Sequence, residues 1–184
     1  SYIAVSYILQ CLKQNWKMNV RIMGMFNLVK GQVNGVSCMQ TRRHRDHRGI
    51  LVKPLLQDFD IQDVYFSQSN KRTLRGLHYQ EGQCKILTCI SGSLLDIIVD
   101  VRPRSETYLR YQLLELNEGA NFSVFIPDGC AHGIYTKKGC TMMIQASDIL
   151  RPDKERILHY SYIPELKNII IDNISEKDSN KVAI

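Results

Sequence analysis

The chain has 184 residues, of which 44% are hydrophobic and 23% are charged, and its formal net charge is +6. This length and apolar content suffice for one buried core, so we expect one domain. No apolar run approaches the roughly 20 residues of a membrane helix, and the first residues do not resemble a signal peptide, so we expect a soluble cytoplasmic protein without membrane contacts.

The first 25 residues differ from the rest of the chain, because Ile3, Tyr7, Leu12 and Trp16 could line one face of a short helix. From residue 36 onward, short runs rich in branched and aromatic residues predict strands. These runs are 36–41, 49–55, 64–67, 74–79, 86–90, 94–101, 108–116, 122–126, 133–136 and 141–147.

Turn signals separate most of these strands, for example Ser91-Gly92-Ser93, Asn117-Glu118-Gly119 and Pro127-Asp128-Gly129. Evenly spaced short strands favour a closed or two-sheet antiparallel body, a barrel or a jelly roll. We therefore divide the chain into an N-terminal extension (1–35), an all-β domain (36–171) and a polar C-terminal tail (172–184).

Two motifs carry chemistry. The run Leu74-Arg75-Gly76-Leu77-His78-Tyr79-Gln80 places a guanidinium three residues before an imidazole, and Ile126-Pro127-Asp128-Gly129-Cys130-Ala131-His132-Gly133 adds a second histidine after a turn. An arginine can bind a phosphate, and a histidine titrates near neutral pH. Together they favour proton transfer on an anionic substrate.

The densest positive charge lies in Arg42-Arg43-His44-Arg45-Asp46-His47-Arg48. Nucleic-acid binding is one interpretation, but no aromatic stacking pattern or recognition helix accompanies these residues. We therefore expect no nucleic acid as a partner, and a diphosphate-bearing small molecule suits the cluster better.

A metal-dependent enzyme is the competing class. It needs a His-x-His pair with a following carboxylate, whereas Tyr79 and Gln80 follow His78. The six cysteines form no Cys-x-x-Cys pair, which is typical of reduced thiols and not of a zinc site. We expect neither a metal nor another cofactor.

From about Val36 to Ile171 the chain resembles the dTDP-4-dehydrorhamnose 3,5-epimerase family. The resemblance rests on Asp46–Gly49, Gln68–Asn70, Leu74–Gln80, Lys85, Asp96–Arg102, Ile126–Gly133, Ser147-Asp148, Pro152 and Glu155. It implies a cupin-like double-stranded β-helix jelly roll and a homodimer whose subunits share pocket residues. It also implies isomerase activity on a nucleoside-diphosphate 4-keto-6-deoxyhexose, in the biosynthesis of a surface polysaccharide such as lipopolysaccharide O-antigen.

The resemblance also implies roles for individual residues. His78 would be the catalytic base and Arg75 would bind the phosphates, while Lys85 and His132 would lie near the sugar and its developing oxyanion. Four further positions match substrate-contacting residues of the family: Arg48, which would reach the neighbouring subunit's pocket, Gln68, Asn70 and Glu155.

Several positions depart from the family pattern. Ile144 occupies the position of the family's acid, a tyrosine, and Ile149 and Ile50 stand where aromatic residues stack on the base. Lys53 replaces a glutamate that contacts the base. In 159–164, where the family places the carboxylate that orients the histidine, no carboxylate occurs before Glu165.

Two functions therefore stay open. One is an epimerase or isomerase that keeps His78 as the base and uses an altered acid; full 3,5-epimerisation is not expected of a site without its tyrosine. The other is a catalytically inactive relative that binds a nucleotide sugar or a partner enzyme.

Overall fold

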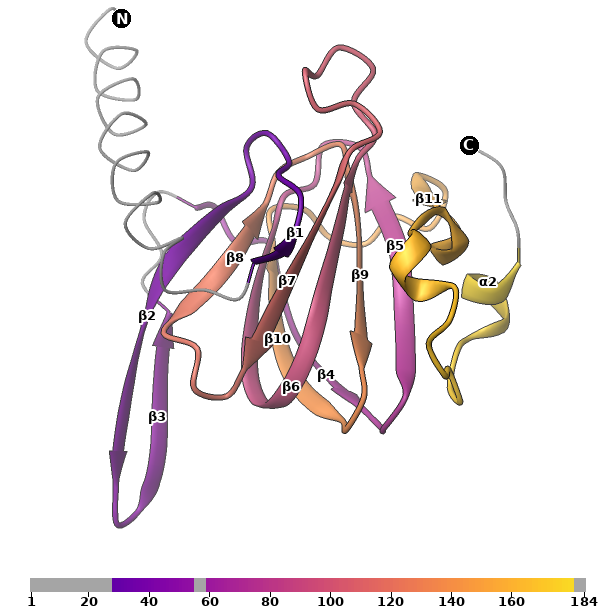
Figure 1. The fold of residues 1–184 in the computed structure, drawn as a ribbon. Coiled ribbons are helices and arrows are strands. Elements are labelled where there is room, and N and C mark those ends of the chain that lie inside the picture. The colour runs from indigo at the N-terminus through magenta and orange to yellow at the C-terminus, as the bar shows by residue number, and fades with distance from the viewer. Residues whose placement is uncertain (1–27, 55–58, 181–184) are drawn as a thin grey trace, which may run out of the picture.

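A computed structural model describes residues 28–54 and 59–180. The helix predicted for the first 25 residues lies outside this part of the chain. Within the described residues eleven strands dominate, and the helical segments are short (Figure 1). The strands are β1 (Leu28–Lys30), β2 (Ser37–Asp46), β3 (Gly49–Pro54), β4 (Asp63–Ser69), β5 (Thr73–Gln80), β6 (Lys85–Asp100), β7 (Tyr111–Asn117), β8 (Phe122–Ile126), β9 (Cys130–Thr136), β10 (Cys140–Ala146) and β11 (Glu155–Ile157). The helical segments are η1 (Tyr160–Tyr162), η2 (Pro164–Leu166) and α2 (Glu176–Ser179).

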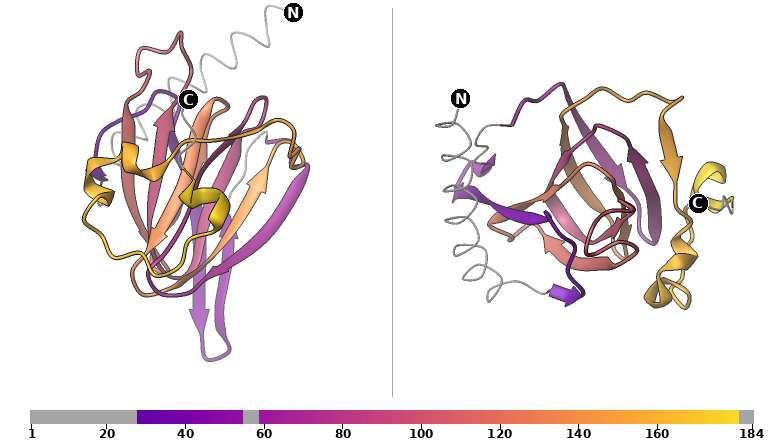
Figure 2. Two further views of the ribbon diagram at one scale, coloured as in Figure 1. Left: turned by 90° about the vertical axis from the view of Figure 1, so that its right-hand side faces the viewer. Right: turned by 90° about the horizontal axis from the view of Figure 1, so that it is seen from above.

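The long strand β6 joins two antiparallel sheets. Its first part, from Lys85 to Gly92, pairs with β10 and β8, and its second part, from Ser93 to Asp100, pairs with β7 and β9. The first sheet has the order β4-β10-β6-β8-β2, and the second has the order β11-β5-β9-β6-β7-β1. Figure 2 shows the strands curving around a common interior. The predicted all-β jelly roll is confirmed, but the turn predicted at Ser91-Gly92-Ser93 is wrong, because the strand continues through it.

Side chains alternate between the two faces of each strand, and this alternation fills two cores. One core lies between the sheets and includes Leu87, Ile98, Val124 and Ile144. The other lies on the outer face of the second sheet, where Leu158, Ile163 and Leu166 pack on residues of β5, β6, β7 and β9. The C-terminal segment therefore covers this sheet from outside (Figure 2), and the inner face stays free for a pocket.

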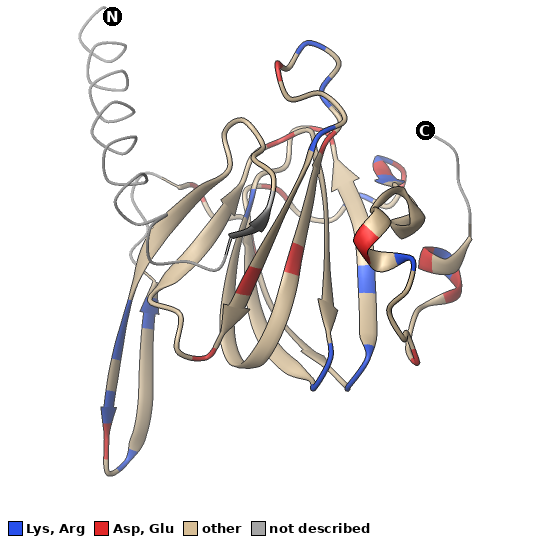
Figure 3. Cartoon of the chain, viewed as in Figure 1, with Lys and Arg blue, Asp and Glu red and all other residues tan. Residues whose placement is uncertain are grey.

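The hairpin of β2 and β3 extends away from the body (Figure 1). Lys and Arg residues occur on both of its strands (Figure 3), and Ile50 and Leu51 are exposed on it. Arg48 is at its turn, with a side chain 79% exposed and paired with Asp46 at 2.6 Å. Most of the densest positive charge of the sequence therefore lies on a projection, whereas the Arg43 guanidinium donates to the backbone carbonyls of Ala120 and Cys89 in the body.

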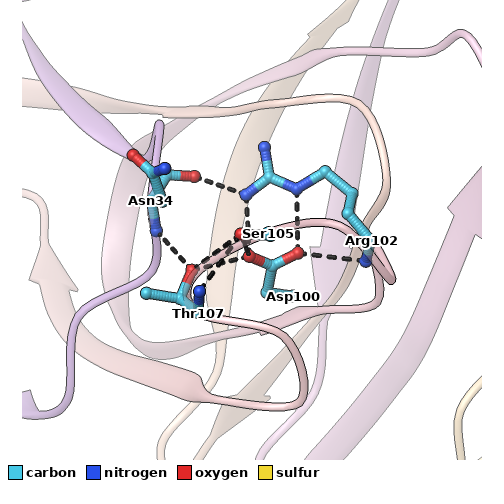
Figure 4. Close-up of polar contacts among 5 residues, drawn as sticks. All are labelled: Asn34, Asp100, Arg102, Ser105 and Thr107. Carbon is cyan, nitrogen blue, oxygen red and sulfur yellow. Dashed lines mark hydrogen bonds and ion pairs between the residues drawn. The ribbon is translucent and has the colours of Figure 1, made fainter.

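A buried aspartate organises the loop that follows β6. The carboxylate of Asp100 accepts hydrogen bonds from the Arg102 backbone and guanidinium, from Ser105 Oγ at 2.5 Å and from Thr107 Oγ1 at 2.6 Å (Figure 4). Arg102 and Thr107 also bond the backbone of Asn34. The network thus ties the loop to the segment before β2.

We expect this network to stabilise the fold in a pH-dependent way. Burial alone would raise the pKa of Asp100, but the hydrogen bonds from Arg102, Ser105 and Thr107 outweigh it and lower the pKa to about 2. Because the pKa is lower in the folded state, the contribution is present above about pH 4 and is lost as the pH falls toward 2. At 1.36 kcal/mol per pKa unit, it amounts to about 2 kcal/mol.

Urea unfolding of Asp100→Asn at pH 7 and pH 3 measures this contribution. The substitution should lower the free energy of unfolding by about 2 kcal/mol at pH 7 and by less at pH 3. Asp153→Asn, at an exposed position, is the control and should change it by less than about 0.5 kcal/mol. Equal losses at both pH values would contradict the assigned role of the ionised carboxylate.

Candidate functional site

A cavity of about 540 Å³ opens between the inner faces of the two sheets. This volume falls within the usual range for small-molecule sites. The second sheet contributes side chains of β5 and β9, and the first sheet contributes side chains of β4, β10 and the start of β6. The polar and charged side chains in its lining include Tyr65, Ser67, Arg75, His78, Lys85, His132, Lys177 and Asp178, and Met142, Ile134 and Ile144 form an apolar wall.

His78 forms a dyad with Asp178. The distance between His78 Nε2 and Asp178 Oδ1 is 2.5 Å, and the Gly76 amide donates to Asp178 Oδ2 at 3.1 Å. With Asp178 ionised, Nε2–H is the donor and the lone pair of the ring is on Nδ1. The expectation that His78 lacks a carboxylate partner is therefore wrong.

The carboxylate of Asp178 is nearly buried, with the residue only 4% exposed. Burial alone would raise its pKa, but the hydrogen bonds from His78 and the Gly76 amide outweigh burial and hold the pKa below its ordinary value. Asp178 therefore stays ionised at neutral pH, which suits a group that orients a histidine and stabilises its cation.

The C-terminal segment reaches the pocket along the edge of β5. Asn173 pairs with Thr73, and its backbone carbonyl accepts a hydrogen bond from the Leu74 amide at 3.0 Å. Ser175 then caps α2 by accepting the Asp178 amide at 3.1 Å. The sequence predicts a polar tail at residues 172–184. As far as residue 180, hydrogen bonds fix this segment against the body of the fold.

Two glycines bring β5 and β9 close together beside the dyad. A Cβ on Gly76 would lie 2.6 Å from the Gly133 Cα, and one on Gly133 would lie 2.5 Å from the Arg75 carbonyl oxygen. Gly76 also has a φ of 107°, which L side chains rarely adopt. The motifs Leu74–Gln80 and Ile126–Gly133 therefore each need a glycine where the backbones of β5 and β9 touch. In this strand register His78 lies directly opposite His132.

His132 forms a second dyad. Its Nε2 lies 2.6 Å from Oδ1 of Asp96, and both side chains are buried on the inner face of the sheet. Asp96 Oδ2 has no hydrogen-bond partner among the residues that the structure describes. The sequence analysis does not predict Asp96 as a site residue. Its position within the apolar run Leu94–Ile98 is the signal that could have identified it, because a carboxylate buried among apolar residues needs a polar partner.

Cationic side chains surround the two histidines. Burial lowers the pKa of Lys85 below its ordinary value, and the nearby carboxylate of Glu155 opposes this shift. Arg75 Nε donates to Ser69 Oγ at 2.9 Å, which leaves part of its guanidinium available to an anion. Glu155 Oε1 lies 3.4 Å from His78 Nδ1, and Lys177 pairs with the other oxygen of Glu155.

The structure separates the remaining predicted residues from this pocket. Gln68 and Asn70 line a different hollow beside Ser91 and Lys138. In β4 the residues that line the cavity are Tyr65 and Ser67 instead, one face away from Gln68. Ile149 is exposed beyond β10, and Arg48 lies on the hairpin, so neither lines the cavity of its own chain.

Among residues 28–54 and 59–180, no group of three or more His, Cys, Asp or Glu side chains is arranged to hold a metal ion. In the same part of the chain, no helix has the length and apolar character needed to cross a membrane.

Comparisons with known proteins identify the family and agree with the fold. The family model described as dTDP-4-dehydrorhamnose 3,5-epimerase matches residues 30–184. The dTDP-4-dehydrorhamnose 3,5-epimerase of Mycobacterium tuberculosis (strain CDC 1551 / Oshkosh) is 30% identical over 128 residues, which are 62% of this chain and 63% of the relative. The chain therefore spans less than two thirds of that relative.

Solved structures show the same fold. The dTDP-4-dehydrorhamnose 3,5-epimerase from Sulfolobus tokodaii matches with a TM-score of 0.70 and 30% identity, over 83% of this chain and 92% of the other. A 3'-monoepimerase from Streptomyces bikiniensis in complex with dTDP-quinovose matches with a TM-score of 0.72 and 24% identity, over 80% of this chain and 83% of the other. At 24% identity, the match to the 3'-monoepimerase supports the fold alone.

Proposed function

Since the chain belongs to the dTDP-4-dehydrorhamnose 3,5-epimerase family, we propose that it is an epimerase acting on a nucleoside-diphosphate 4-keto-6-deoxyhexose. The His78–Asp178 dyad is the observation that carries this proposal. A carboxylate-supported histidine at the wall of a cavity of this size suits removal of a proton from carbon. A protein that only binds a nucleotide sugar has no need of such a pair.

The substrate's ketone makes the neighbouring C–H bonds acidic, and His78 is the base that removes one proton. Lys85 and His132 line the same cavity, and they stabilise the negative charge that develops on the ketone oxygen; Asp96 holds His132 from behind. Arg75, whose Nε is held by Ser69 Oγ, binds the diphosphate. The chemistry of His78, Lys85, His132 and Arg75 and their common lining of the cavity support these roles.

The natural setting of this activity is nucleotide-sugar synthesis for a surface polysaccharide in the cytoplasm. The functional unit is a homodimer, formed through the projecting hairpin of β2 and β3. Its exposed Ile50 and Leu51 supply apolar surface, and exposed Val64 and Phe66 on β4 supply more. In this assembly Arg48 contributes to the pocket of the partner subunit.

Proton exchange in deuterated water tests the proposal. The protein is incubated with dTDP-, UDP- and GDP-linked 4-keto-6-deoxyhexoses, and NMR follows the signals of the C3 and C5 hydrogens. We expect deuterium at one or both carbons of at least one substrate, because removing a proton requires only the base. His78→Ala, which lacks the base, is the control.

Two outcomes would contradict catalysis. Absence of exchange with every sugar nucleotide, combined with measurable binding of one of them by calorimetry, would assign the chain to the binding-only class. Exchange that continues at the wild-type rate in His78→Ala would show that another group is the base.

A further inference from the structure

Inversion at carbon needs a proton donor on the side of the sugar away from the base. His78, Asp178 and His132 all reach the cavity from the second sheet or from the segment along its edge. A donor for the other side must come from the first sheet, whose polar lining residues are Tyr65, Ser67 and Lys85.

Tyr65 is well placed for this role. It pairs with Ile144 in the register of β4 and β10, so both side chains are on the same face, and both line the cavity. Ile144 is only 2% exposed, whereas Tyr65 is 42% exposed. The aliphatic residue therefore forms the closed wall, and the phenol is the neighbouring group that reaches the open part of the cavity.

Tyr65 on β4 and His78 on β5 also lie at similar distances from the turn that joins the two strands. β4 and β5 are joined by the short turn at residues 70–72, where the chain crosses from one sheet to the other. Tyr65 and His78 lie at about the same number of residues from this turn, and strands rise by about 3.3 Å per residue. The two side chains therefore enter the cavity at a similar height, from different sheets.

We propose that Tyr65 is the catalytic acid that completes inversion in this chain. The inference rests on the proposed epimerase function and adds a residue to it. His78 first takes the proton from carbon, and the C–H electron pair forms the C=C bond of an enolate. The C=O bond becomes C–O⁻.

In the second half of the reaction, the C=O bond forms again and the carbon takes the proton of the Tyr65 hydroxyl from the opposite side. This step leaves a phenolate on Tyr65 and an imidazolium on His78. Exchange with water then returns a proton to Tyr65 and removes one from His78. No oxidant or further reactant is consumed.

The surroundings of Tyr65 favour the protonated phenol. Burial of the phenol raises its pKa, and the nearby carboxylates of Asp63 and Glu155 raise it further. The hydroxyl group therefore carries its proton at neutral pH. Ser67 lines the same face, but a serine hydroxyl is a far weaker acid than a phenol, and Lys85 is more useful as a fixed charge beside the enolate.

Tyr65→Phe tests the proposal, because it removes the hydroxyl and keeps the ring. In deuterated water, the variant should still exchange the substrate hydrogen that His78 removes, at a rate within about threefold of wild type. Formation of inverted product, read from the ring couplings by NMR, should fall by about a hundredfold or more. Tyr108→Phe is the matched control, because Tyr108 is 41% exposed and does not line the cavity.

A second variant tests the position of the acid. Adding Ile144→Tyr to Tyr65→Phe places a phenol one strand away on the same face and should restore at least a tenth of the lost inversion. Inversion that is unchanged in Tyr65→Phe would overturn the role of Tyr65 and leave the epimerase function standing. Wild-type exchange without any inversion would also overturn it, whereas absence of exchange in wild type would refute the proposed function itself.

Discussion

Asp178→Asn is expected to slow proton exchange at carbon by about a thousandfold or more while the protein stays folded. An asparagine has the same shape and can still accept the Gly76 amide through its oxygen. Its amide nitrogen then faces His78 Nε2, which must accept instead of donate. The proton of the ring moves to Nδ1, and the wrong tautomer is fixed; the same change in a serine-protease triad costs about 10⁴ in kcat.

Exchange rates by NMR and thermal unfolding of the same samples measure this effect. Asp153→Asn is the control, because Asp153 is exposed near β11 and does not line the cavity. A loss of less than tenfold in a folded Asp178→Asn protein would mean that the dyad does not activate His78. Loss of the fold would be separated from loss of chemistry by the melting curve.

Asp96→Ala is expected to destabilise the protein by about 3–5 kcal/mol, because it breaks a buried pair and leaves one partner in place. The remaining His132 is buried, and its Nε2 would lose the oxygen that lies 2.6 Å away. A small cavity would add to the loss. For a chain of this size, 1 kcal/mol corresponds to roughly 2–4 °C, so the melting temperature should fall by at least about 6 °C.

Two matched variants make this test specific. Asp96→Asn keeps the volume and a hydrogen-bonding group, so it should cost clearly less than Asp96→Ala. Glu115→Ala removes a carboxylate from an exposed position on the neighbouring strand and should change stability by less than about 0.5 kcal/mol. Similar melting temperatures for Asp96→Ala and Glu115→Ala would show that the His132–Asp96 pair does not hold the interior together.

Much of the fold could be predicted from the sequence, because alternating branched and aromatic residues define strands locally. The prediction failed where tertiary pairing overrides a local signal. Ser91-Gly92-Ser93 has the composition of a turn, yet β10 and β7 pair with this stretch on either side and keep β6 continuous. Within residues 28–54 and 59–180, strand β11 pairs with β5 alone, through three residues, and so short a strand has too little local pattern to be predicted.

The site could be predicted only in part, for two physical reasons. Arg75, His78, Lys85 and His132 lie in motifs whose glycines and strands position them, and the structure brings all four to one cavity. Asp178 comes from a polar segment 100 residues after His78, and only tertiary contacts bring it there. On β4 a shift of one residue exchanges the two faces, which is why Tyr65 lines the cavity and Gln68 does not.

The central claim is that His78, held by Asp178, removes a proton from carbon. The most direct test is the mass of dTDP-, UDP- and GDP-linked 4-keto-6-deoxyhexoses recovered from deuterated water after incubation with wild type, His78→Ala or Asp178→Asn. For at least one of these sugars, we predict a gain of at least one mass unit with wild type and none with either variant over the same time. No gain with wild type for any of the sugars, or an equal gain with all three proteins, would contradict the claim.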